Sequence, residues 1–244
     1  MTELWKSITS ISLWGSIVNA LMVLAGASFG LLLRSVMKRG AEGGAMQRVS
    51  DALMKGLALC VILIGVQGAI KTTNMILVIL CIVFGTVIGE LCRLEHGMEV
   101  LGEKLERATK GRFGEVTRGF VSASLLFCVG SMAIVGALNS GLMRDHTMQY
   151  TKGLIDMCVA VVFASTMGFG VLFSSGLILL YQGSITLLAT LIAPYLTTYV
   201  ITEMTAVGSL LIMGLGLNML GLTKLKIMNH LPAVFLPLLF CLFM

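Results

Sequence analysis

Few side chains in the apolar stretches of this sequence are able to do chemistry, and Asp156 stands first among them. Lys152 lies four residues before it, the spacing at which two side chains of one helix form an ion pair. Asn19 and Gln182 are amides in equally apolar surroundings, and an amide offers both a hydrogen-bond donor and an acceptor. Polar groups in such surroundings need a partner or a ligand. The combination indicates a site that binds a small solute or an ion.

Five residues are the first candidates for that binding site, and three more are secondary. The first five are Asn19, Ser124, Ser131, Asp156 and Gln182, and the secondary three are Asn139, Glu203 and Glu90. Each has a structural alternative. Serines let helices approach closely and bond back to their own helix. Glu203 suits a cap where a helix starts, and Glu90 suits an interfacial ion pair with Arg93.

Catalytic and metal-binding signatures are absent from the sequence. It contains no nucleotide-binding GxxxxGK[ST] loop, no HExxH zinc motif and no GxSxG nucleophile motif. The three histidines lie far apart, and the six cysteines form no CxxC pair. We therefore expect no enzyme activity, no metal and no cofactor, and the missing nucleotide loop excludes an ATP-driven pump.

The amino-acid composition indicates the kind of structural element in which these residues lie. Of the 244 residues, 57% are hydrophobic and only 12% are charged, and the mean hydropathy is +0.97. Soluble domains have about 45–50% apolar and about 25% charged residues. The chain is therefore expected to be an all-α integral membrane protein with the lipid bilayer around it. The net charge of +5 indicates no nucleic-acid partner, because the basic residues lie between apolar runs.

Runs of about 20 apolar residues match the thickness of a bilayer. They predict a single polytopic membrane domain, residues 1–244, with about eight transmembrane helices. The expected spans are 13–34, 53–71, 74–92, 119–142, 153–173, 176–198, 203–223 and 227–244. In this scheme Asp156 lies about two turns inside its helix, near the edge of the hydrocarbon.

The basic residues predict the orientation. Loops 34–55, 93–118 and 224–226 hold all but four of the 17 basic residues, the exceptions being Lys6, Lys71, Arg144 and Lys152. These three loops fall on one side of the eight-span scheme, and basic loops stay cytoplasmic. Both termini are therefore expected outside, on the periplasmic face of a bacterial inner membrane. Within the second loop, residues 97–118 predict a cytoplasmic amphipathic helix, either a solvated connector or a partner-binding element.

Two parts of the chain resemble each other weakly. Residues 1–95 and 119–198 each hold three expected spans and share short Gly-rich motifs, and 203–244 adds two C-terminal spans. Three spans in a repeat make the second copy inverted, a plan found in secondary transporters. The alternative is that Gly-rich apolar helices look alike by composition alone.

Glycines four residues apart, Gly26 with Gly30 and Gly85 with Gly89, indicate faces at which helices pack. Such Gly-rich faces would also permit a homo-oligomer.

Several segments together resemble a known family: Gly85-Thr86-Val87-Ile88-Gly89-Glu90, the run from Ser124 to Gly136, Tyr181-Gln182-Gly183, and Asn229-His230-Leu231-Pro232-Ala233. The chain resembles the bacterial inner-membrane proteins of the YqgA/YdfK type, which carry a domain of unknown function. The resemblance implies a multi-spanning bacterial membrane protein of a kind often described as a transporter. It brings no established functional residues.

Two functions from different classes remain open. The first is a secondary transporter or exchanger of a small solute or ion, in which Asp156 carries the coupling charge. The alternative is a non-transporting accessory or scaffold protein that packs with a partner. The first requires polar groups that meet in the membrane, whereas the second requires only dry helix contacts.

Overall fold

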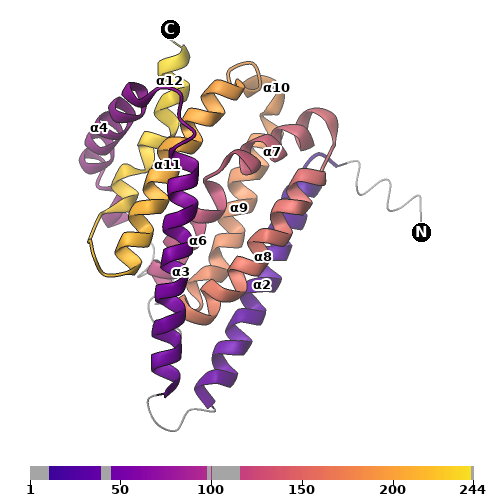
Figure 1. Ribbon diagram of the computed structural model, residues 1–244. Coiled ribbons are helices and arrows are strands. Elements are labelled where there is room, and N and C mark those ends of the chain that lie inside the picture. The colour runs from indigo at the N-terminus through magenta and orange to yellow at the C-terminus, as the bar shows by residue number, and fades with distance from the viewer. Residues whose placement is uncertain (1–10, 40–44, 98–99, 101–115, 243–244) are drawn as a thin grey trace, which may run out of the picture.

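The computed structural model describes residues 11–39, 45–97, 100 and 116–242, and helices are the only regular elements in these ranges. Figure 1 shows them as a bundle. In chain order they are α2 (Trp14–Arg39), α3 (Ala45–Ala69), α4 (Met75–Leu91), α6 (Val116–Cys128), α7 (Ser131–Met143), α8 (Thr147–Met167), α9 (Gly170–Leu187), α10 (Ala189–Ile192), α11 (Thr198–Met219), the 3-10 helix η1 (Ile227–Phe235) and α12 (Leu236–Leu242).

The expected all-α membrane architecture is confirmed. Five helices, α2, α3, α8, α9 and α11, are long and apolar enough to cross a bilayer. The bent pair α6–α7 makes a sixth candidate span, and α4 and the η1–α12 segment are shorter apolar helices. These segments follow the order of the eight expected spans.

Three of the expected spans were placed too far along the chain. The helices begin at Thr147, Gly170 and Thr198 instead of at residues 153, 176 and 203, and the expected connection at 173–176 lies inside α9. The cause is Gly168, whose positive φ of 85° ends α8. Asp156 is therefore the tenth of the 21 residues of α8, close to the centre of this helix and not near its start, where the expected span placed it.

The expected span 119–142 is broken. Gly130, with φ of 145°, separates α6 from α7, and the two helices meet at a bend of 64°. Positive φ values of this kind are accessible to glycine and strained for other residues. Ser131 opens α7 at this break and is exposed.

Glycines bring the helix pairs together. A side chain at Gly26 or Gly30 of α2 would overlap the backbone carbonyls of Met157 and Val161 in α8. Likewise, Gly85 and Gly89 of α4 lie against the backbone of η1. The interpretation of these glycines as packing faces is confirmed.

The remaining organisation lies partly beyond the described ranges. Residues 98–99 and 101–115 are outside them, so the amphipathic helix expected over 97–118 is not described. The internal repeat stays a prediction. The first described helix, α2, begins and the last, α12, ends in the upper half of the bundle in Figure 1.

Candidate functional site

The centre of α8 carries a buried ion pair. The Lys152 ammonium contacts the Asp156 carboxylate directly, and the two residues are 6% and 7% exposed. Their spacing of four residues places both side chains on one helix face, as the sequence predicts. An ion pair in such surroundings is held only at a considerable desolvation cost. Its position near the middle of an apolar helix therefore marks a place with a specific role.

Two amides from neighbouring helices meet beside this ion pair. Asn19 Nδ2 on α2 donates a hydrogen bond of 3.0 Å to Gln182 Oε1 on α9, and both residues are fully buried. The Asn19 amide is also within interaction range of the Asp156 carboxylate. Gly153 makes this approach possible, since a Cβ there would lie only 3.2 Å from Asn19 Cα.

The two amides leave hydrogen-bonding capacity unused. Asn19 Oδ1 and Gln182 Nε2 are buried and have no partner in the structure. If the oxygen and nitrogen of both side-chain amides are exchanged, the hydrogen bond between them reverses its direction. One acceptor and one donor still stay unpaired, because each side-chain amide carries one oxygen and one nitrogen. An unpaired buried polar group costs about 1–3 kcal/mol. A water molecule, an ion or a polar solute placed between the amides would recover that free energy.

A second polar layer lies one helical turn closer to the start of α8. Gln149 Nε2 donates to Ser16 Oγ at 3.2 Å, and Ser16 Oγ lies 3.3 Å from Thr186 Oγ1. The Thr186 hydroxyl in turn donates to the carbonyl of Ala137 at 3.1 Å. All four residues are buried. Helices α2, α7, α8 and α9 are thus joined by one continuous set of hydrogen bonds.

A third layer closes the N-terminal end of α8. His146 Nδ1 and Ser140 Oγ lie 3.0 Å apart, and both residues are buried. A Cβ at Gly15 would overlap Gln149 Oε1 and would lie 2.8 Å from Ser140 Oγ and 3.0 Å from His146 Nδ1. The second and third layers therefore meet where α2 has no side chain. We call the buried polar side chains of all three layers the polar column. Its members are His146, Ser140, Gln149, Ser16, Thr186, Asn19 and Gln182.

An exposed carboxylate, Asp145, lies next to His146 at one end of the polar column. Asp145 lies in the connection between α7 and α8, and its Oδ1 accepts a hydrogen bond of 3.0 Å from the Thr147 backbone N–H. Hydrogen bonds from the backbone and side chain of Thr147 lower the pKa of Asp145. The carboxylate next to His146 consequently stays negative into the acid range.

The other half of α8 is packed with apolar side chains. Beyond Asp156, the buried residues Ala160, Phe163, Ala164 and Met167 join a core cluster that includes Val23 and Ala27 of α2. The buried hydroxyl in this half belongs to Thr166, and it bonds to the carbonyls of its own helix at Val162 and Phe163. Buried polar side chains therefore occupy one side of the ion pair in three layers, and an apolar core occupies the other side.

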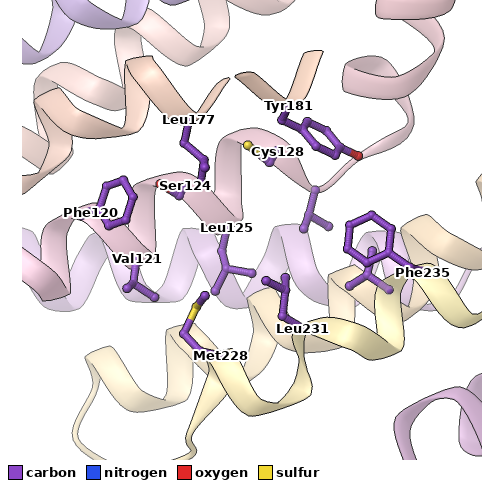
Figure 2. Close-up of a pocket in the computed structure, with 12 residues that line it drawn as sticks. Phe120, Val121, Ser124, Leu125, Cys128, Leu177, Tyr181, Met228, Leu231 and Phe235 are labelled. Carbon is purple, nitrogen blue, oxygen red and sulfur yellow. The ribbon is translucent and has the colours of Figure 1, made fainter. Parts of the chain in front are cut away.

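A cavity of about 280 Å³ lies between α6, α9 and η1. Figure 2 shows Ser124 and Cys128 of α6 between Leu177 and Tyr181 of α9 and the side chains of η1. The lining is almost entirely apolar, but the buried Ser124 Oγ has no hydrogen-bond partner in the structure. Cys128 lies within electrostatic range of Lys152 and Asp156, so the cavity adjoins the ion pair.

The structure brings together three of the five first candidates, Asn19, Asp156 and Gln182. Ser124 belongs to the adjoining cavity. Ser131 is exposed at the α6–α7 break, and the half-buried Asn139 uses its backbone carbonyl to cap the end of α7.

The secondary carboxylates hold other parts of the fold. The fully buried Glu203 accepts hydrogen bonds from Thr72 Oγ1 at 2.5 Å, from Thr73 N at 2.8 Å and from Thr73 Oγ1 at 2.9 Å. It ties the α3–α4 connection to α11 and so holds the fold, but it does not cap its own helix as predicted, because α11 begins at Thr198 with Thr197 as the N-cap. Glu90 lies 3.7 Å from Lys226 Nζ and accepts a hydrogen bond from Asn229, instead of pairing with Arg93 as predicted.

Several members of the polar column were not among the expected site residues: Ser16, Ser140, His146, Gln149 and Thr186. Gln149 and His146 were assigned to a loop, because the span was expected to begin at residue 153. The signal that could have found them is the helical spacing of Gln149, Lys152 and Asp156, which places all three on one face.

Together, the apolar helices and the buried polar groups between them define a multi-spanning α-helical membrane protein. Residues 14–242 match a family described as protein of unknown function (DUF554), and the chain belongs to this family. It is similar to the uncharacterized membrane protein YdfK of Bacillus subtilis (strain 168), with 30% identity over 229 residues. It is also similar to the uncharacterized protein YqgA of Escherichia coli (strain K12), with 28% identity over 229 residues. Each alignment covers 92% of this chain and 94% of the relative. No solved structure matches the chain.

Proposed function

We propose that this protein is a secondary transporter or exchanger of a small solute or ion. The observation that carries the proposal is the Lys152–Asp156 ion pair near the centre of α8, beside an unpaired donor and an unpaired acceptor of Gln182 and Asn19. Buried charges and unpaired amides both cost free energy. A fold that only needed helix contacts would be more stable with apolar residues in these places.

The surroundings of the ion pair suit alternating access. The buried polar side chains of the polar column lead from the N-terminal end of α8 towards the ion pair, whereas the apolar cluster around Phe163 fills the C-terminal end. Gly130, with positive φ, interrupts the α6–α7 span, and Gly168, also with positive φ, forms the turn that ends α8. Interrupted helices near the centre of the membrane are where transporters bind their solutes. Movement at these breaks would open the second side.

We also propose that the protein lies in a bacterial inner membrane with both termini in the periplasm. The C-terminal end of α2 and the α11–η1 connection both lie in the lower half of the bundle in Figure 1. The first contains Arg34 and the second Lys224 and Lys226, and basic segments face the cytoplasm. Alkaline phosphatase fused after Met244 should be active in cells, since this enzyme folds only in the periplasm. An inactive fusion would reverse the orientation.

The transport proposal is tested first by ligand-induced stabilisation. The purified full chain is heated in detergent with amino acids, organic acids, sugars and inorganic ions. A ligand present at about 100 times its Kd stabilises the folded protein by about 2.7 kcal/mol. We expect one chemical class to raise the midpoint of unfolding, and we expect Asn19→Ala and Asp156→Asn to abolish the effect. Thr166→Val, which changes a buried hydroxyl in the dry half of α8, should leave it unchanged.

A compound found in this way is then followed into proteoliposomes. Gradient-driven uptake by the wild-type protein, and uptake without gradient coupling by Asp156→Asn, would support the proposal. A panel without any stabilising compound, together with no flux that depends on Asp156, would favour the alternative of an accessory or scaffold protein.

A further inference from the structure

The polar column has the form of a connection between one surface of the protein and its buried ion pair. It begins at His146 and Ser140 beside exposed Asp145 and ends at Asn19 and Gln182. Successive layers lie one helical turn apart, because Ser16 precedes Asn19 by three residues and Gln182 precedes Thr186 by four. At the end of the column, the unpaired Asn19 Oδ1 and Gln182 Nε2 supply two of the polar partners that an internal water needs.

We propose that the polar column is a proton path between the α7–α8 surface and the Lys152–Asp156 ion pair, so that the proton is the coupling ion. This rests on the proposed transport function. A hydroxyl is able to donate one proton and accept another, as a relay requires. The hydroxyls of Ser140 and Thr186 act in this way when they turn from the carbonyls of Asp145 and Ala137, to which they donate in the structure. The Gln149 amide holds the Ser16 hydroxyl in line. Waters between the layers complete the path.

The chemical step at the end of the path is balanced. A proton that arrives binds one oxygen of the Asp156 carboxylate, and the carboxylic acid formed no longer pairs with the Lys152 ammonium. No other bond breaks, and the positive charge of the site rises by one. Because an uncompensated buried charge is costly, the protonated site favours a conformation or a bound solute that compensates it. Loss of the proton to the opposite side restores the ion pair.

The helices that pack against α8 present few other titratable groups to this ion pair. In their described ranges, α7 has none, α9 has Tyr181, and α6 has Arg118 and Cys128. The titratable groups of α2 begin at Arg34, in the part of the helix that faces the apolar half of α8, and α3 carries Arg48, Asp51, Lys55 and Cys60. Cys128 and Tyr181 lie next to each other near the ion pair, and His146 lies at the far end of the column. Asp156 is thus the acidic group to which the column leads.

The first experiment measures protonation without any solute. Infrared difference spectra of the full chain in lipid are recorded while the pH is stepped between about 4 and about 10. A carboxylic acid band that appears as the pH falls, disappears in Asp156→Asn and shifts in Asp156→Glu is expected. Glu203→Gln is the matched control, because Glu203 is the second fully buried carboxylate on the described helices, and the band should persist in it. Absence of an Asp156-dependent band in this range would overturn the proposal.

The second experiment tests the route. After a rapid drop in pH, the Asp156 band should form about tenfold more slowly in Gln149→Leu, an increase of about 1.4 kcal/mol in the barrier. Ser16→Ala should slow it in the same direction. Thr166→Val removes a buried hydroxyl from the same helix on the other side of the ion pair and should leave the rate unchanged. Equal rates in Gln149→Leu, Ser16→Ala and the wild-type protein would overturn the assignment of the path.

The two proposals fail in different ways. Solute uptake that is independent of the proton gradient, with no Asp156 band, would refute the proton path while the transport function stands. An Asp156 band that forms through the column, in a protein that moves none of the tested solutes, would support the proton path and refute solute transport.

Discussion

The contact between α2 and α8 has two halves that differ in chemistry although one helix pair forms both. In the half near the start of α8, Gly15, Ser16 and Asn19 face buried polar side chains. In the other half, Gly26 and Gly30 lie against the backbone of Met157 and Val161. Glycine serves both halves, since it leaves room for polar side chains in the first and lets two backbones touch in the second. The same sequence feature can therefore open a path or seal one.

The largest expected effect comes from separating the charges in the polar half. Lys152→Met leaves the Asp156 carboxylate buried without its cation and should lower the free energy of unfolding by about 3–5 kcal/mol. The double variant Lys152→Met/Asp156→Leu removes both charges and should recover most of that loss while it abolishes transport. SDS-induced unfolding of both variants measures this. A double variant no more stable than Lys152→Met would mean that the ion pair is needed for folding.

The next largest effect is expected from a methyl group added in the other half of the α2–α8 contact, where the two backbones touch. We call this half the sealed half. Gly26→Ala and Gly30→Ala each force the α8 backbone away, because the new Cβ would overlap a carbonyl oxygen. We expect each to cost about 1–3 kcal/mol of unfolding free energy. Gly56→Ala in α3 is the matched control, because a Cβ there has no atom within 4 Å. Equal midpoints of unfolding for all three variants would contradict the close backbone contact.

The same change in the polar half should cost less. A Cβ at Gly15 meets the ends of side chains, which are able to move, and the expected loss is that of one hydrogen bond, about 1 kcal/mol. Gly15→Ala should nevertheless slow the protonation of Asp156, since it pushes Gln149, Ser140 and His146 apart. Thermal unfolding and pH-jump infrared spectra of one preparation separate the two effects. A large loss of stability with unchanged protonation would remove the distinction between the halves.

The smallest effect is expected from the hydroxyl in the sealed half. Thr166 donates to carbonyls of its own helix, so Thr166→Val should change the free energy of unfolding by no more than about 0.5 kcal/mol. Its transport and protonation rates should equal those of the wild-type protein. A transport defect in Thr166→Val would show that the path continues past Asp156.

The helices themselves were predictable from the sequence, whereas several of their ends were not. Long apolar runs identify α2, α3 and α11 because lipid requires them to be that long. The turn after α8 consists of Gly168 and Phe169, which are as apolar as the helices on either side. The left-handed conformation of Gly168 shows only in three dimensions. Placing that turn about six residues late, with the span expected to begin at residue 153, left Gln149 outside the expected helix and His146 far from its start.

The candidate site, like the helices, has parts that the sequence predicts and parts that it does not. Asn19, Asp156 and Gln182 were found because amides and carboxylates are rare in apolar runs and costly in lipid. Their meeting could not be predicted, since it depends on how α2, α8 and α9 pack. Ser16 and Thr186 were harder still, because a hydroxyl in a membrane helix can bond to its own backbone, as Thr166 does.

The short helix α4 has a consequence for the lipid around the protein. Its 17 residues span only about 26 Å, against a hydrocarbon thickness of about 30 Å. It packs on η1 and turns large apolar side chains outward, among them Met75, Ile76, Val83 and Phe84. Hydrophobic mismatch at this edge should draw the two leaflets together locally. The protein would then be more stable in bilayers of shorter-chain lipids, which relieve the compression beside α4.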